Sequence, residues 1–294
     1  MYAELNGTRL FFDVDGAQFD VVDGELVEKP VCFVVHGGPG GNHVAFKPYL
    51  DSLKPYMQLI YIDQRGSGFS DSSDPATYTM EQNVEDLESL RQYLGLGKVW
   101  IFGHSYGGMV AQGYATQYEQ HLDGLFLITT AGHGNFMQMA KEIVDERGSE
   151  EHTAYCNKLW AGELNTDEDL QRFYELMGPW YSMKPAEKRP VTYRSKEALN
   201  RGFGGFLRDM DYIEALKHIR VPALIIAGQH DWITPPAANE EIAKAMPNGE
   251  YRLFENSSHK VMADEPERFH HEMVSFLERH GRVRATQSSV ADER

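Results

Sequence analysis

Cysteine and long apolar runs are scarce in this sequence. Its 294 residues include only Cys32 and Cys156, too few for the disulfide frameworks that hold small secreted domains together. The longest apolar runs, such as 223–227, are far too short to cross a bilayer. Residues 1–10 lack the basic and apolar regions of a secretion signal. We therefore expect a cytoplasmic protein without a structural disulfide.

Basic charge and metal-binding patterns are also lacking. Acidic residues outnumber basic ones by 44 to 28, which gives a formal net charge of −16. Such a surface repels phosphate backbones and anionic lipids, so nucleic acids and membranes are not expected as partners. The absence of an H-E-x-x-H pattern and of a cysteine–histidine cluster predicts no metal site.

What the sequence does contain is a regular alternation of short and long patterns. The N-terminal part alternates around the turn dipeptides Asp15-Gly16 and Asp23-Gly24, which predicts antiparallel strands. Short apolar or β-branched runs then alternate with helical patterns, which indicates an α/β fold with a parallel sheet covered on both faces. The predicted strands are 31–35, 59–62, 99–102, 125–129, 223–227 and 251–254, and the predicted helices are 80–94, 106–118, 236–246 and 265–279.

One long stretch, 132–211, interrupts this alternation. It contains no strand-like run, helical patterns dominate it, and aromatic residues gather in it. Because ligands of open α/β sheets bind beyond the carboxyl ends of the strands, we interpret it as an inserted helical cap over the site. The predicted organisation is an α/β core of residues 1–131 and 212–283, the cap, and a disordered tail of residues 284–294.

The segment 103–107 reads Gly-His-Ser-Tyr-Gly and fits the G-x-S-x-G pattern. It follows a predicted strand and opens a predicted helix, the setting in which a sharp turn presents the serine hydroxyl above the sheet. The N-terminus of the helix adds a positive dipole and free N–H groups beside that hydroxyl. We therefore predict that Ser105 is a nucleophile, with a plain glycine-rich turn as the alternative.

A serine hydroxyl is a poor nucleophile unless a base takes its proton, and twelve histidines compete for that role. His259 is the best placed, because it follows the last predicted strand after a short loop and such loops converge on the site. Asp231 follows the strand before it, so the order Ser, Asp, His is that of an α/β-hydrolase triad. Helix capping is the alternative role for Asp231. We expect the His230 side chain to point away from that of its neighbour Asp231 and interpret His230 as structural.

Two further segments follow predicted strands. The first, 36–40, reads His-Gly-Gly-Pro-Gly, and its glycines allow backbone amides to approach a substrate oxygen. We predict an oxyanion hole formed by the amides of Gly38 and Tyr106, with a purely structural turn as the alternative. The second, 63–68, reads Asp-Gln-Arg-Gly-Ser-Gly, and we expect Asp63 to pair with Arg65 or to cap this turn.

These motifs together resemble the prolyl iminopeptidase family of serine peptidases. The segments that carry the resemblance are 36–40, 63–70, 103–108, 228–231 and 258–259. The resemblance implies an α/β-hydrolase fold with an eight-stranded sheet, a helical cap and no cofactor. It also implies release of an N-terminal residue, often proline, from a peptide or amide. The family's nucleophile, acid and base fall on Ser105, Asp231 and His259.

One position departs from the family pattern. Members hold the free amino group of the substrate with carboxylates from the cap or near the catalytic acid. In the most similar branch a glutamate directly follows that acid, whereas here the position is Trp232. Glu163, Glu187 and Glu197 in the predicted cap are candidates for the role, and we favour Glu197 because it precedes the return to the sheet.

The sequence therefore predicts a serine hydrolase that forms an acyl-enzyme with a short peptide or small molecule. The favoured substrate is an N-terminal amino acid in amide linkage. A carboxylic ester or a lactone is the first alternative, in which Trp232 would mark an apolar acyl pocket. A lyase or cofactor-free oxygenase is a more remote alternative, because fold does not fix function. The complete triad counts against a non-catalytic binding protein.

Overall fold

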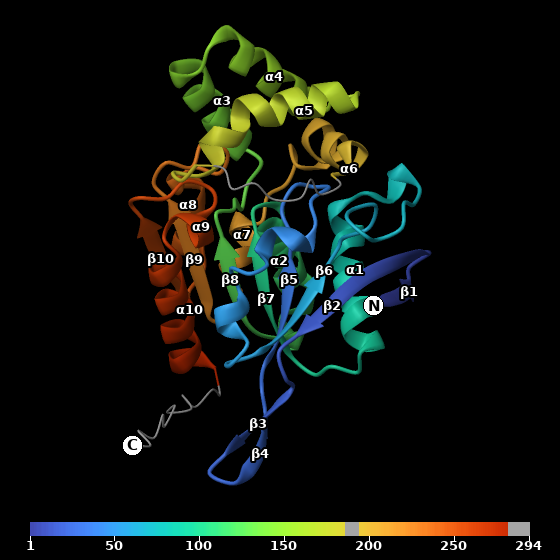
Figure 1. Cartoon of the computed structure of the whole chain (residues 1–294), viewed down its shortest axis with the longest axis vertical. Helices are drawn as coiled ribbons and strands as arrows, with labels where there is room; N and C mark the ends of the chain where they lie inside the picture. The colour runs from blue at the N-terminus through green and yellow to red at the C-terminus, as the bar shows by residue number, and fades with distance from the viewer. Residues whose placement is uncertain (186–193, 282–294) are drawn as a thin grey trace, which may run out of the picture.

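An eight-stranded, mostly parallel sheet forms the centre of the protein (Figure 1). The computed structural model describes residues 1–185 and 194–281, so the predicted tail, 284–294, lies outside the described residues. The strand order is β1-β2-β6-β5-β7-β8-β9-β10, in which the β1–β2 and β2–β6 pairs are antiparallel and the others parallel. This confirms the predicted fold class. The strands are β1 (Tyr2–Leu5), β2 (Thr8–Asp15), β5 (Val31–Val35), β6 (Gln58–Ile62), β7 (Val99–His104), β8 (Leu122–Ile128), β9 (Ala223–Gly228) and β10 (Gly249–Phe254).

Helices cover both faces of this sheet, which explains why its central strands are apolar on both sides. In β5, Phe33 and Val35 pack into one core cluster, and Cys32 and Val34 pack into the other. The first cluster includes side chains of α1, α2 and α8, and the second includes side chains of α10. Among the described residues, no helix is both long and apolar enough to cross a membrane. The helices of the core are α1 (Met80–Tyr93), α2 (Tyr106–Tyr118), α7 (Ile213–Leu216), α8 (Pro236–Ala245), α9 (Val261–Asp264) and α10 (Pro266–His280).

Two tight turns shape the N-terminal part of the chain. Asp23 and Gly24 join β3 (Phe19–Val22) to β4 (Glu25–Glu28), and this hairpin extends away from the sheet (Figure 1). Their φ angles of 54° and 84° identify the type I′ turn expected of an Asp-Gly pair. Asn6 and Gly7, with φ angles of 48° and 75°, form a second such turn, between β1 and β2, that was not predicted.

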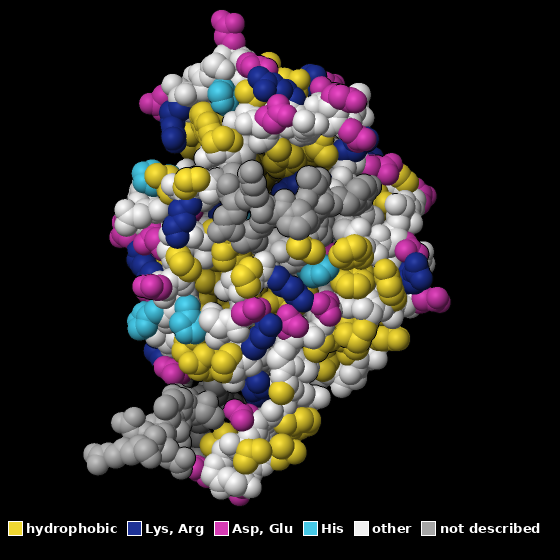
Figure 2. Space-filling model, viewed as in Figure 1, with side chains coloured by type: hydrophobic (Ala, Val, Ile, Leu, Met, Phe, Trp, Pro, Cys, Tyr) yellow, Lys and Arg dark blue, Asp and Glu magenta, His cyan; other side chains and the backbone are white. Residues whose placement is uncertain are grey.

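The hairpin of β3 and β4 carries apolar side chains on its surface, which Figure 2 shows at the lower end of the molecule. The exposed ones are Phe19, Val21, Leu26 and Val27. Above the hairpin, acidic and basic side chains are interspersed on the same face (Figure 2). The net negative charge is therefore not gathered into a single patch on this face.

A helical insertion joins β8 to β9 and lies above the carboxyl ends of the strands (Figure 1). Its two connections to the core run side by side and are joined by two hydrogen bonds. The N–H of Gly134 donates to the carbonyl of Met210 at 2.7 Å, and the N–H of Tyr212 donates to the carbonyl of Gly132 at 2.8 Å. This pairing supports boundaries at 132 and 211, which we propose for the cap. The helices of the insertion are α3 (Phe136–Arg147), α4 (Glu150–Ala161), α5 (Asp167–Met177) and α6 (Lys196–Arg201).

Candidate active site

Ser105 occupies the sharp turn between β7 and α2. Its φ of 56° is unusual for a residue with a side chain, and such backbone strain is concentrated at functional sites. The neighbouring glycines make the turn possible. A Cβ atom on Gly103 would overlap the carbonyl oxygen of Gly107, and one on Gly107 would overlap that of Val35. The turn therefore brings α2 directly against β5, and Ser105 lines a cavity.

His259 and Asp231 form a buried hydrogen-bonded pair in the loops after β10 and β9. The distance between His259 Nδ1 and Asp231 Oδ2 is 2.7 Å. Because a carboxylate only accepts hydrogen bonds, Nδ1 carries the proton, and Nε2 is left with a lone pair. Asp231 also accepts bonds from the backbone of Ile233 and from the backbone and hydroxyl of Thr234. These bonds fix both the carboxylate and the orientation of the imidazole.

Asp231 therefore stabilises its own turn without capping a helix, since α8 begins at Pro236 with no side-chain cap. His230, the neighbouring histidine, is exposed and is not among the described residues that line the cavity.

A cavity of about 160 Å³ lies beneath the helical insertion, and both Ser105 and His259 line it. Its wall is mostly apolar and aromatic, as is usual for small-molecule sites. A cavity of roughly this size holds a molecule as large as benzene. The insertion contributes Leu159, Phe173, Tyr174, Tyr181, Leu199 and Phe203 to this wall.

Of the two residues whose amides are predicted to form an oxyanion hole, Tyr106 directly follows Ser105 and Gly38 lines the same cavity as Ser105. Gly38 lines the cavity with a φ of 125°, and a Cβ atom there would lie 2.7 Å from the amide nitrogen of Gly40. Within residues 1–185 and 194–281, neither the Gly38 N–H nor the Tyr106 N–H donates to another protein group. The Tyr106 side chain is buried away from the cavity wall, and its hydroxyl accepts a bond of 3.0 Å from Asn83.

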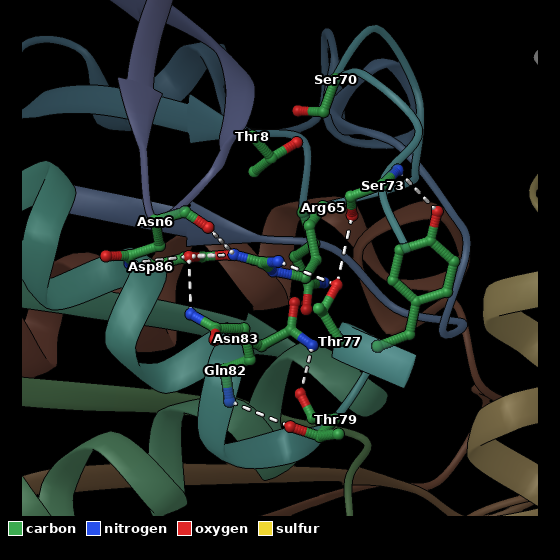
Figure 3. A network of polar contacts seen from close by, with 12 residues as sticks. Asn6, Thr8, Arg65, Ser70, Ser73, Thr77, Thr79, Gln82, Asn83 and Asp86 are labelled. Carbon is green, nitrogen blue, oxygen red and sulfur yellow. Dashed lines mark hydrogen bonds and ion pairs between the residues drawn. The ribbon is translucent and has the colours of Figure 1, made fainter. Parts of the chain in front are cut away.

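A buried polar network supports this region from the side of α1 (Figure 3). Arg65 makes two bonds of 2.7 Å to Asp86 and one of 3.0 Å to the hydroxyl of Thr77. Asp63 does not pair with Arg65. It accepts bonds from the backbone and ring of His43 and from the backbone of Phe69, so it caps its turn, the second of the two expected roles.

Comparison with known proteins agrees with this geometry. A family model described as alpha/beta hydrolase fold matches residues 30–266. This chain belongs to the α/β-hydrolase family. Its resemblance to prolyl iminopeptidases is also confirmed, since it is 32% identical to a proline iminopeptidase of Saccharolobus solfataricus over 83% of each chain. It is 29% identical to the proline iminopeptidase PfmaB of Pestalotiopsis fici, over 95% of this chain and 99% of that protein.

The solved structures show the same fold. An alpha/beta fold family hydrolase from Bacillus anthracis superimposes with a TM-score of 0.74 at 21% identity, covering 94% of this chain and 98% of the other.

The residues predicted to contact the substrate in this hydrolase lie elsewhere. Glu197 and Glu163 are exposed and do not line the cavity, because α6 turns its neighbouring residues Ala198 and Leu199 inward instead. Trp232 is fully buried behind the wall, with its ring 5.5 Å from that of Tyr181. None of the three is among the described residues that line the cavity, and a role for them in binding the substrate stays a prediction. Glu187 lies outside the described residues.

The structure also reveals a contact that the sequence analysis missed. The backbone carbonyl of His259 accepts two bonds of 3.0 Å, from Nε2 of His104 and from the hydroxyl of Thr129. Burial, followed by the charge of His259, lowers the pKa of His104 to about 3, so this ring stays neutral. His104 occupies the variable position of G-x-S-x-G, where no residue type is prescribed, so the motif carried no signal for this role.

Proposed function

We propose that this hydrolase uses Ser105, His259 and Asp231 as a catalytic triad and forms an acyl-enzyme. The observation that carries the proposal is the shared cavity of Ser105 and His259, with His259 fixed by the 2.7 Å bond to Asp231. In this arrangement the lone pair on His259 Nε2 is free to accept the serine proton.

The proposed reaction has two steps. Ser105 Oγ attacks the substrate carbonyl while His259 takes its proton, and Asp231 stabilises the resulting imidazolium. The amides of Gly38 and Tyr106 bind the oxyanion. His259 then returns the proton to the leaving amine or alcohol. In the second step His259 activates a water molecule, which hydrolyses the ester on Ser105 and releases the acid.

For the substrate we propose an N-terminal residue of the proline type, released from a peptide or amide. Several curated relatives that are 26–32% identical over most of this chain are proline iminopeptidases, which supports this choice. The compact cavity of about 160 Å³, with its mostly apolar and aromatic wall, suits a small ring such as that of proline.

A carboxylic ester or a lactone is the second candidate substrate. One specific observation favours it, namely that none of the described residues lining the cavity is acidic. An aminopeptidase must bind a charged amine, and an unpaired buried ammonium group is costly. An ester with a neutral acyl chain has no such requirement.

Assaying prolyl anilide, its N-acetyl derivative and a p-nitrophenyl acyl ester side by side separates these candidates. The proposed aminopeptidase cleaves prolyl anilide, and acetylation of the amine lowers kcat/KM by at least about tenfold, the effect of one lost charged contact. Equal or faster cleavage of the acylated substrates would establish the second candidate. A Ser105→Ala preparation controls for contaminating hydrolases.

A further inference from the structure

The wall of the active-site cavity carries positive charge, although the whole chain has a net charge of −16. Arg194 and Lys260 line the cavity, and its described lining includes no aspartate or glutamate. His36 and His104 also line it, and burial lowers the pKa of both, so neither adds charge near neutral pH. The cavity is therefore suited to an anionic group.

Arg194 is held at a defined place in this wall. The next residue, Ser195, donates its backbone N–H to the carbonyl of Gly40 at 2.9 Å. A Cβ atom on Gly40 would overlap the Ser195 carbonyl, so the chain at 195 packs directly against the loop of residues 36–40. The insertion thus places Arg194 beside the loop that carries the proposed oxyanion hole.

The guanidinium group of Arg194 is oriented by Tyr174, another residue of the wall. It lies 4.3 Å from the centre of the Tyr174 ring, and its Nη1 donates a bond of 3.0 Å to the Tyr174 hydroxyl. No carboxylate of the described residues pairs with Arg194, whereas Arg172 on the outer face of α5 pairs with Glu151 and Glu175. Arg194 keeps N–H donors in the planar fork that matches a carboxylate.

We propose that the substrate carries a carboxylate and that Arg194 binds it. This inference rests on the proposed function in one respect, namely that the substrate binds in the same cavity. The carboxylate has two possible sources. It is either the free C-terminus of a short peptide whose first residue is released, or the end of an acyl chain. Under the proposed aminopeptidase activity the first source applies, so the enzyme prefers short peptides to neutral amides.

Binding to the inactive Ser105→Ala variant tests the inference without relying on catalysis. Titration calorimetry would compare prolyl-alanine with prolyl-alanine amide for the leaving side, and monoethyl glutarate with ethyl valerate for the acyl side. We expect the carboxylate member of one pair to bind at least about tenfold more tightly at low salt, and the difference to narrow as salt screens the charges. The pair that shows the difference identifies the source.

Three variants in the same background complete the test. Arg194→Gln should remove most of the tenfold preference and leave binding of the neutral member within about twofold, whereas Arg194→Lys should retain part of it. Arg172→Gln makes the same change on the surface of the insertion and should retain the full preference. Thermal melting of each variant would verify that the insertion remains folded.

Equal binding of both members in both pairs would overturn the inference, as would equal weakening of both members by Arg194→Gln. The second result would show that Arg194 only clamps the insertion onto Tyr174. These failures are distinct from failure of the proposed function, which would appear as absence of turnover by the enzyme that retains Ser105.

Discussion

At the scale of single residues, Asp231 shows how completely one carboxylate can be fixed. Its two oxygens accept bonds from His259 Nδ1, from two backbone amides and from the Thr234 hydroxyl. Every one of these partners is a donor. Asparagine has the same shape, but its amide nitrogen is itself a donor. It therefore cannot accept hydrogen bonds from all four partners.

The variant Asp231→Asn therefore tests the orientation of His259. We expect kcat to fall by roughly four orders of magnitude, as in other serine hydrolases, because the amide favours the wrong imidazole tautomer. The fold should be retained, which circular dichroism would verify. As a control, Asp123→Asn, at an exposed position, should keep the wild-type kcat. A rate within tenfold of the original would show that Asp231 does not orient the base.

At the scale of elements, the contact between β5 and α2 determines where Ser105 lies. Gly107 has no room for a side chain, because a Cβ atom would overlap the Val35 carbonyl and lie 2.8 Å from that of His36. The variant Gly107→Ala must push the helix away from the strand. We expect it to lower the free energy of unfolding by roughly 1–3 kcal/mol, the range for overpacking, and to abolish turnover.

The matched control is Gly97→Ala, because Gly97 lies before β7 at an ordinary φ, and a Cβ atom there would have no neighbour within 4 Å. It should be neutral or slightly stabilising. Urea unfolding and activity assays measure both effects. Wild-type stability and turnover in Gly107→Ala would contradict the proposed role of this contact.

Some features of these elements could be predicted from the sequence, and others could not. The predicted helices end within two residues of those observed, because apolar periodicity and flanking turn residues are local signals. The order of Ser105, Asp231 and His259 could also be predicted from local signals, because each residue follows a strand that is recognisable in the sequence. The inward-facing residues of the insertion depend on how its helices pack, which is not local. The sequence therefore favoured Glu197, whereas Arg194 lies on a connection without periodicity.

At the scale of the whole molecule, two buried histidines make stability depend on pH. Burial lowers the pKa of His36 and lowers that of His104 to about 3. In the unfolded chain both titrate near the ordinary histidine value of about 6.5. Below that pH the unfolded state binds protons that the folded state does not, so stability is lost as the pH falls. Lowered carboxylate pKa values, such as that of Glu88 at about 2, act only at lower pH.

We therefore expect the free energy of unfolding to be nearly constant between about pH 7 and pH 8 and to fall between pH 6 and pH 5. The slope should approach, at most, about 1.4 kcal/mol per pH unit for each buried histidine. Urea unfolding at pH 7, 6 and 5 measures this slope. His104→Asn should flatten it, and the same change at exposed His230 should not. Equal stability at pH 5 and pH 7 would contradict this account.

The central claim is that Ser105 is the covalent nucleophile of this cavity, and mass spectrometry after treatment with a fluorophosphonate tests it most directly. We predict a single adduct, mapped by proteolysis to Ser105 and absent from Ser105→Ala. That variant should also lose roughly four or more orders of magnitude in turnover. An adduct on another residue, or full turnover by Ser105→Ala, would contradict the claim.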